Sequence, residues 1–471
     1  MSRKNWLILG AGVVIFALIA TLRVVSFPSR PVGSVADLAS LKDRHLNVVF
    51  ILIDTLRADR LHAYGYERPT SPTLDDIAST GILFRHVESQ SSWTKCSMAS
   101  LLTGYYPIRT GVLRFSQAIP EEARMPAEVF HDAGYVTTGL FRNGWVAPNF
   151  GFSQGFDVYV KPTPRQQAPQ GFVRRPGSTK LPGTDEDITL AAGEFLRTYA
   201  DQKFFLYLHY MDVHQYAFDQ AAADLDFGSK LSDSYDASIH WVDNNVYRVL
   251  RSMDELGLLE KSLVVIAADH GEGFREHGVE GHARTLYREV VSVPLIFMLP
   301  FRLKSELQVE PVVRNVDIWP TIFDLVGLQA PAGADGRSLV PVVEASSRGE
   351  KPAASPPAYA YLDQHWGQVG KEPAPLLAVR EGDHRILWSR GGAGGDRTSS
   401  YDLREDPGER HDLGTKPAWY PSLRAKLERH GQQAVAWSQK EVEISEMYRA
   451  QLRALGYVEK AAPKPKRAPS P

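Results

Sequence analysis

The sequence is poor in cysteine and has no excess of charge of either sign. The only cysteine, Cys96, has no partner for an internal disulfide, and a zinc site built from several cysteines is excluded. The 53 Lys and Arg residues nearly balance the 55 Asp and Glu residues, giving a net charge of -2. Without a basic field, nucleic acid is not an expected partner. The 471 residues suffice for a large α/β domain and a smaller one.

One long apolar run stands at the N-terminus, where residues 6–22 (WLILGAGVVIFALIATL) follow Arg3 and Lys4. Its 17 residues reach the lower limit of a membrane-spanning helix, roughly 17–25 residues. A positive start before an apolar stretch is typical of a signal anchor or a secretory signal peptide. The run lacks an Ala-x-Ala cleavage site, which favours an uncleaved anchor over residues 1–25. Either interpretation predicts an extracytoplasmic globular part, on the periplasmic or extracellular face.

Strand-like and helix-like segments alternate through the first two thirds of the chain. Residues 46–54, LNVVFILID, form a continuous β-branched run that predicts a buried strand ending in a carboxylate. Residues 135–141, 204–212 and 262–269 are also strand-like, with helix-like segments between them. This alternation predicts an α/β fold with a mostly parallel sheet flanked by helices.

The pattern changes near residue 330. Short alternating segments separated by glycine-rich turns predict an antiparallel sheet in a smaller subdomain, followed by a terminal helix over 420–437. The basic Pro/Ala tail has the composition of a disordered segment. The expected organisation is an anchor (1–25), a linker (26–45), a catalytic domain (46–330), a C-terminal α+β subdomain (331–458) and the tail (459–471).

Metal-type side chains follow three of the predicted strands. Asp54 ends the first strand, Asp212 and His214 follow the third, and Asp269 and His270 follow the fourth. In open α/β sheets, ligands bind beyond the carboxyl ends of the strands. A single Asp after a strand is most simply an N-cap or turn residue. Three such ends, two of them with a histidine, indicate a metal site.

Two further segments carry side chains that could do chemistry. Residues 269–287 hold His270, His277 and His282 among glycines, and imidazoles serve as metal ligands or proton donors. The alternative is a polar surface loop. In residues 91–107, Thr94 stands where a helix is expected to begin, and helix N-termini stabilise anions. A hydroxyl there, near a metal, can act as a nucleophile; otherwise it caps the helix.

Together these segments resemble the sulfatase family of the alkaline phosphatase superfamily, over residues 46–415. The resemblance rests on motifs in the family's order, from the first metal-binding loop to later landmarks. It implies an alkaline phosphatase-like fold and metal-dependent cleavage of a sulfate or phosphate ester. The motifs are ILIDTLRADRLHAYGYERPTSPTLDDIA, WTKCSMASLLTG, FLYLHYMDVHQY, VVIAADHGEGFREHGVEGH, VPLIF, NVDIWPTIFDLVGL and YDLREDPGERHDL.

The resemblance implies that Asp54 and Asp269 bind the metal. His270 stands where sulfatases often have Asn and where phosphonate or phosphate diester hydrolases of the family have His. Thr55 replaces a frequent second Asp, which argues against a calcium site with four carboxylates. Ligands of the Asp and His type favour Mn or Zn, with Ca possible.

Other positions match substrate-contacting residues of the family. His214 matches a substrate-binding His. His282, thirteen residues after Asp269, stands where relatives have a Lys or His that contacts the ester oxyanion or the leaving group. Asn143 stands where relatives have another polar residue that contacts substrate. We expect His282 to protonate the leaving oxygen, and His214 to help neutralise the ester.

Thr94 aligns with the catalytic Cys or Ser of the family, with Cys96 at the Pro position and Met98 at the Arg position of the motif. No formylglycine is therefore expected. A metal-bound Thr94 has one hydroxyl, so its ester must be attacked by water or an alcohol, a route that phosphorus tolerates. The predicted function is hydrolysis of a sulfate or phosphate ester, on a substrate that could be a lipid or glycan. The alternatives are a membrane-associated transferase of phosphoethanolamine or phosphoglycerol and a degenerate binding protein without activity.

Overall fold

The structure is a computed structural model that describes residue 27 and residues 30–165, 171–174, 182–220, 227–368, 371–392 and 395–443. In it, the apolar runs form the middle of one mixed sheet. The strands β2 (Asn47–Ile53), β9 (Phe204–Tyr210) and β11 (Ser262–Ala267) are buried at every position, as expected of strands covered on both faces. The strand order is β17-β3-β15-β11-β2-β9-β6-β7. The neighbours from β11 to β7 are parallel, and β15 is antiparallel to both of its neighbours. The other strands are β3 (Ile82–Phe84), β6 (Val136–Phe141), β7 (Val158–Val160), β15 (Leu295–Met298) and β17 (Leu307–Val309).

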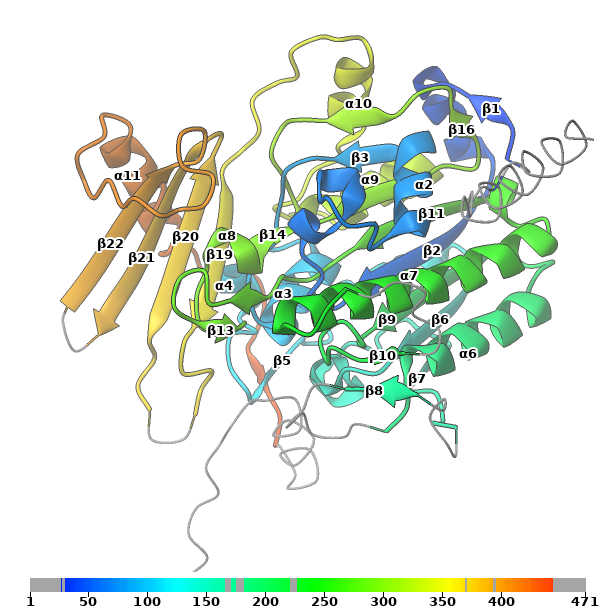
Figure 1. The fold of residues 1–471 in the computed structure, drawn as a ribbon, viewed down its shortest axis with the longest axis horizontal. Helices are drawn as coiled ribbons and strands as arrows, with labels where there is room; N and C mark the ends of the chain where they lie inside the picture. Colours follow the sequence, from blue (N-terminus) through cyan, green and yellow to red (C-terminus); the bar gives the residue numbers. More distant parts are fainter. Residues whose placement is uncertain are drawn as a thin grey trace, which may run out of the picture.

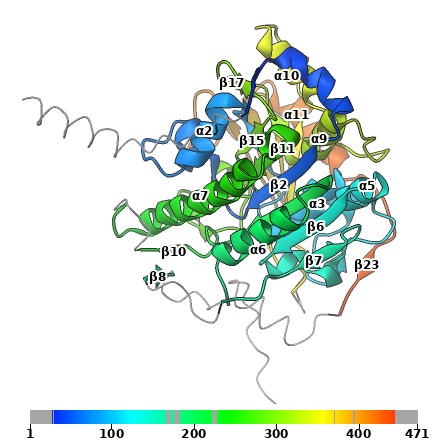
Figure 2. The same cartoon turned by 90° about the vertical axis from the view of Figure 1, so that its right-hand side faces the viewer.

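Helices cover both faces of this sheet. The helices α2 (Pro72–Thr80), α6 (Asp185–Thr198) and α7 (Leu231–Glu255) lie along one face (Figure 1). The helices α5 (Pro126–Asp132) and α9 (Ile318–Val326) cover the other, which Figure 2 shows from the side. On that face Trp319 packs against Phe50 and Phe205, with ring centroids 4.9 and 5.5 Å apart. Layers of this kind bury the sheet completely and leave only its ends for a site.

The C-terminal part forms a second sheet, seen at the left of Figure 1. Its four antiparallel strands are β19 (Ala358–Asp363), β20 (Pro375–Glu381), β21 (His384–Gly392) and β22 (Gly395–Asp402). Leu423 and Leu427 of α11 (Tyr420–His430) pack against it. The helix is shorter than the predicted 420–437: it ends before Gly431, and the chain then returns to the main body, where Ala436 N donates to Arg109 O. The predicted fold class, a mostly parallel sheet with helices and a C-terminal antiparallel sheet, is confirmed.

The segment expected to be a linker packs onto the main body. Phe27 and Arg30 are buried, and Arg30 Nη1 donates to Leu299 O at 2.9 Å. Beyond them lie β1 (Val32–Gly33) and the 3-10 helix η1 (Val35–Asp43). The expected anchor, residues 1–25, lies outside the described residues, and none of the helices within them is long and apolar enough to cross a bilayer.

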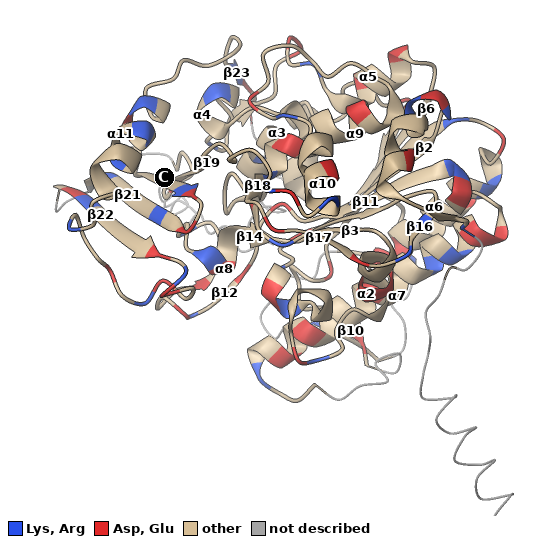
Figure 3. Cartoon of the chain, turned by 90° about the horizontal axis from the view of Figure 1, so that it is seen from above, with Lys and Arg blue, Asp and Glu red and all other residues tan. Residues whose placement is uncertain are grey.

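Short strands and helices complete the described chain. Figure 3 shows acidic and basic residues interspersed along it rather than gathered by sign. The elements are α3 (Thr94–Thr103), α4 (Pro107–Thr110), α8 (Arg288–Val291), α10 (Val340–Ser347), β4 (Val87–Glu88), β5 (Gln117–Ala118), β8 (Phe172–Val173), β10 (Phe218–Asp219), β12 (Gly273–Phe274), β13 (Glu280–Gly281), β14 (Ser292–Val293), β16 (Arg302–Leu303), β18 (Val313–Arg314) and β23 (Lys440–Glu441).

Candidate active site

Two carboxylates and a histidine meet at the carboxyl ends of neighbouring strands. β2 and β11 are paired in parallel, so Asp54 after β2 and Asp269 after β11 lie at the same edge of the sheet. Ligand atoms of Asp54, Asp269 and His270 all lie within 4.8 Å of one another. All three side chains are fully buried. The structure thus brings together three of the residues that the sequence predicts as metal ligands.

Asp54 is held by one of its two oxygens. Oδ2 accepts from Asn143 Nδ2 at 2.5 Å and pairs with His209 Nε2 at 3.0 Å. The Tyr207 hydroxyl, 2.6 Å from His209 Nδ1, donates to that nitrogen, which leaves the ring proton on Nε2. Within the part of the chain that the structure describes, Oδ1 has no hydrogen-bond partner. His209 therefore orients a predicted ligand, a role that was not predicted from the sequence.

Asp269 has the same asymmetry. Its Oδ1 accepts from the Thr55 backbone N–H at 3.3 Å, and its Oδ2 has no hydrogen-bond partner among the residues described. Burial and the charge of Asp54 raise the pKa of Asp269 to about 7. Burial also acts on Asp54, but the hydrogen bond from His209 acts in the opposite direction, and the pKa of Asp54 lies below the ordinary range. Without a cation, one carboxylate of this pair tends to keep a proton.

His270 presents an unprotonated nitrogen to the two free oxygens. Its Nδ1 lies 3.0 Å from Gly271 O, and because a carbonyl only accepts, Nδ1 carries the proton. Nε2 lies 3.3 Å from Asp269 Oδ2 and 3.9 Å from Asp54 Oδ1. Two unpartnered, fully buried carboxylate oxygens beside an imidazole lone pair are costly unless a cation joins them. The donor set therefore fits a divalent cation.

Thr94 lies beside this cluster, at the start of α3. Its Oγ1 is 3.1 Å from His270 Nε2 and 3.5 Å from Asn143 Nδ2. At the N-terminus of a helix, backbone N–H groups and the helix dipole favour negative charge. Cys96, one half-turn later, is buried, and burial raises the pKa of its thiol to about 12. Of these two side chains, only Thr94 contacts the cluster.

His214 and His282 stand on the solvent side of the cluster, where both are partly exposed. The His282 ring lies 4.5 Å from the His270 ring and 4.8 Å from the His214 ring. Glu272, also not predicted from the sequence, lies 3.2 Å from His282 Nδ1. Burial lowers the pKa of His282, but the charge and hydrogen bond of Glu272 outweigh it and raise the pKa. The pKa of His214 is lowered by burial, so it favours the neutral form.

Asn143 lies within the cluster, whereas Asp212 and His277 lie away from it. Asn143, expected to contact substrate, donates to Asp54 and accepts from Trp145 N at 2.9 Å. Asp212, at a strand end, does not face the cluster; its Oδ1 pairs with Arg142 Nη1 at 2.6 Å. His277 lies at the tip of the β12–β13 hairpin, bound to Glu289. Only the last two are outside the site.

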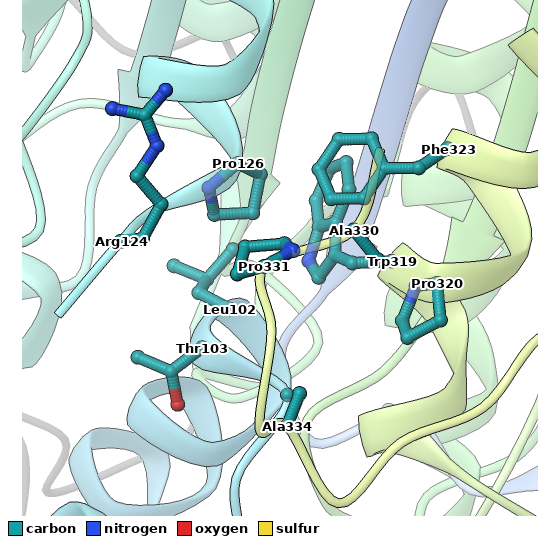
Figure 4. Close-up of a pocket in the computed structure, with 11 residues that line it drawn as sticks. Leu102, Thr103, Arg124, Pro126, Trp319, Pro320, Phe323, Ala330, Pro331 and Ala334 are labelled. Atoms are coloured by element: carbon teal, nitrogen blue, oxygen red, sulfur yellow. The ribbon is translucent and has the colours of Figure 1, made fainter. Parts of the chain in front are cut away.

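A small apolar crevice lies at the opposite end of α3 (Figure 4). It is lined by Leu102, Pro126, Trp319 and Phe323, with Arg124 beside it. Its volume of about 10 Å³ holds no more than one water molecule. The crevice does not contain any of the candidate site residues.

The site can be compared with known proteins. A sequence model described as sulfatase matches residues 46–328, and one described as N-sulphoglucosamine sulphohydrolase, C-terminal, matches residues 275–434. The chain is 24% identical over 430 residues to the Delta 4,5-hexuronate-2-O-sulfatase of Bacteroides thetaiotaomicron, covering 79% of this chain and 85% of that protein. It is 27% identical over 440 residues to human arylsulfatase A, covering 78% of this chain and 83% of that protein.

Solved structures show the same fold. A putative sulfatase from Bacteroides thetaiotaomicron superposes with a TM-score of 0.67 at 20% identity, covering 84% of this chain and 96% of that one. The phosphonate monoester hydrolase of Agrobacterium radiobacter gives a TM-score of 0.64 at 19% identity, covering 88% and 98%. Because the sulfatase sequence model spans more than half of the residues, this chain belongs to the sulfatase family and is an ester hydrolase of that family.

Proposed function

We propose that the chain is a metal-dependent hydrolase in which Thr94 attacks the phosphorus or sulfur of an ester. The observation that carries this proposal is the 3.1 Å distance between Thr94 Oγ1 and His270 Nε2, inside the cluster that fits a cation. Asp54, Asp269 and His270 would hold a divalent metal, with Thr94 beside it. A bound metal supplies Lewis-acid charge and lowers the pKa of a hydroxyl next to it.

The other side chains orient the nucleophile. The Thr94 hydroxyl donates to the lone pair of His270 Nε2, which has no proton of its own. A metal bound at His270 would take that lone pair, and the Thr94 oxygen would then face the metal instead of the histidine. Asn143 Nδ2 bridges Asp54 Oδ2 and Thr94 Oγ1 at 2.5 and 3.5 Å. The α3 N-terminus then faces the charge that develops on the ester oxygens.

The leaving group takes its proton from His282. Glu272 engages Nδ1 and favours the imidazolium, so Nε2 is the nitrogen from which His282 donates. His214 Nε2 is buried and has no hydrogen-bond partner among the described residues, and a non-bridging ester oxygen bound beside it would supply one. Because the pKa of His282 is raised, this acid is present at low pH and is lost as the pH rises above that pKa.

Thr94 favours a phosphoester over a sulfate ester. A threonyl ester is released only by attack of water or an alcohol on the central atom, since threonine has no second hydroxyl to expel the group. The Agrobacterium radiobacter neighbour is a phosphonate monoester hydrolase. A sulfate ester on a sugar is the second candidate. It is supported by relatives named hexuronate and N-acetylglucosamine-6-O sulfatases, at 24% and 29% identity.

The cellular location is part of the proposal. The apolar run at residues 6–22, after two basic residues, supports an uncleaved anchor with the catalytic domain on the extracytoplasmic face. An alkaline phosphatase reporter fused after residue 471 is expected to be active only when exported. A full-length fusion that is expressed but has no reporter activity would contradict this location.

An ester panel tests the chemistry. The full chain is assayed with 4-nitrophenyl sulfate, phosphate, a phosphodiester and a phosphonate, each with Mn²⁺, Zn²⁺ or Ca²⁺ and without an acceptor alcohol. Thr94→Ala should reduce turnover at least about a thousandfold, and Thr94→Ser should retain it in part. Cys96→Ala is the matched control and should stay near wild type. Activity that follows Cys96 instead of Thr94 would contradict the assignment, and turnover that needs an added alcohol would indicate a transferase.

A further inference from the structure

The β12–β13 hairpin carries the proposed acid at its base. Gly273 pairs with Gly281 and Phe274 with Glu280, so Glu272 and His282 flank the hairpin on either side. His277 lies at its tip. The hairpin is only two residue pairs long, so the position of its tip and that of its base are closely coupled. The importance of that coupling rests on the proposed function of His282.

His277 is bound at both ring nitrogens. Nδ1 lies 2.8 Å from Glu289 Oε1, and Nε2 lies 2.9 Å from the Glu409 carbonyl oxygen. The carbonyl only accepts, and the carboxylate accepts when ionised, so the ring donates to both and carries a positive charge. The ring also stacks on Tyr287 with centroids 3.7 Å apart. Burial lowers the pKa of His277, but Glu289 and the Glu409 carbonyl outweigh it and raise the pKa.

The partner at Nε2 belongs to the turn of the motif YDLREDPGERHDL in the C-terminal subdomain. Glu409 N donates to Asp406 O, and Glu409 has a left-handed φ of 54°. Its Oε2 accepts from Arg288 N at 2.7 Å. The next residue, Arg410, donates from Nη1 to Glu276 O beside the tip. Residues 406–410 therefore hold the hairpin tip from outside the main body.

We propose that this turn, acting through His277, is a positioning element that sets His282 for proton donation to the leaving group. One residue joins tip and base: Glu289 accepts from His277 with its side chain, and its carbonyl accepts from Glu272 N at 3.1 Å. Glu272 in turn orients His282. Displacements of about 1 Å in such networks can reduce a rate by about a hundredfold.

The charges around His277 are balanced without a metal ion. Arg385 Nε lies 3.0 Å from Glu409 Oε1, where it would repel a dication. Donor atoms of His277, Glu289 and Glu409 nevertheless lie within 4.8 Å of one another, so metal binding is one outcome to test. Three carboxylates face three cations: Glu88, Glu289 and Glu409 with Arg380, Arg385 and His277.

Leaving-group dependence separates positioning from general damage. The metal-loaded full chain is assayed on two esters of the acid that it hydrolyses best, one of 4-nitrophenol and one of an aliphatic alcohol. A nitrophenolate leaves with little help, whereas an alkoxide needs a proton. His277→Ala should reduce kcat about tenfold or more on the alkyl ester and less than about threefold on the nitrophenyl ester, with KM unchanged. His277→Gln, which keeps one donor nitrogen, should lie between His277→Ala and wild type, and it replaces the alanine variant if that variant does not fold.

Two controls make each outcome decisive. His411, which follows this turn, has a side chain 84% exposed, and His411→Ala should behave as wild type on both esters. His282→Ala should show the same selectivity as His277→Ala, more strongly. Equal losses on both esters for His277→Ala, with a selective loss for His282→Ala, would overturn the positioning role alone. A His282→Ala variant without selectivity would overturn the proposed acid itself. Loss of one bound metal in His277→Ala would also overturn the proposal.

Discussion

Replacing His209 with alanine should weaken metal binding, because His209 orients Asp54. The His209 ring is fully buried in β9, and its Nε2 lies 3.0 Å from Asp54 Oδ2. The Tyr207 hydroxyl keeps the proton on that nitrogen. The variant leaves Asn143 as the side-chain donor to Oδ2, so the carboxylate can turn away from the position in which its Oδ1 faces the cluster.

The size of the effect follows from the role of such outer partners. Loss of a residue that orients a metal ligand lowers metal affinity by about 10- to 100-fold, or about 1.4 to 2.7 kcal/mol. A second effect acts in the same direction. The His209 hydrogen bond helps hold the pKa of Asp54 below the ordinary range against the effect of burial. Without it the carboxylate binds a proton more readily, and the proton competes with the cation.

Calorimetric titration of the metal-free protein with Mn²⁺ measures this change. Tyr207→Phe is the matched control: it removes only the hydroxyl that fixes the ring tautomer and should cause a smaller loss of affinity. Excess metal should restore much of the activity of His209→Ala. An unchanged dissociation constant, or activity that stays lost at saturating metal, would refute the reasoning.

Asp212→Ala should leave the metal content unchanged and lower the free energy of unfolding by about 3–5 kcal/mol, since Arg142 loses a buried partner. Elemental analysis measures the metal content, and denaturant unfolding measures the stability. Metal loss with intact stability would contradict the prediction. Burial lowers the pKa of His430 to about 4, so the stability due to its neutral ring is present above pH 6.5 and is lost as the pH falls towards 4. Between pH 7 and 5 the loss of folding free energy amounts to about 2 kcal/mol. His430→Phe can still stack on Tyr359 but cannot titrate, so thermal melts of this variant should lack that pH dependence. Because the pKa of Asp269 is about 7 without a cation, metal affinity should fall below pH 7. Calorimetry of metal binding at pH 6, in buffers of different ionisation enthalpy, should detect the release of nearly one proton per metal bound. Binding without proton release would count against the site.

The ends of the central strands could be predicted from the sequence. The apolar runs ending at Asp54 and Asp269 have no polar interruption, which is typical of strands buried on both faces. Parallel pairing then places both carboxylates at one edge. The order of the strands could not be predicted from these runs, because any of them could occupy the centre.

The partners of the ligands could not be predicted in the same way. His209 stands inside the run FFLYLHY, and nothing in that spacing distinguishes a histidine bound to Asp54 from one satisfied in the core. Asp212 follows the same strand, and its position after the strand end predicts a metal ligand. It lies instead where Arg142 and the Asp185 backbone N–H bind its carboxylate. These roles depend on which elements pack against a strand end, and that is a property of the tertiary structure.

The replacement of a second Asp by Thr55 bears on which ester the site prefers. Thr55 has a left-handed φ of 62°, unusual for a β-branched residue, and in this conformation its N–H donates to Asp269 Oδ1. The position thus contributes a donor in place of a third carboxylate. With a dication, the charges of Asp54 and Asp269 cancel, and the Glu272–His282 pair is neutral as well. A floor without net negative charge repels a phosphate monoester dianion less than one with more carboxylates would. The charge of the site therefore supports the proposal, made from the single hydroxyl of Thr94, that the substrate is a phosphoester.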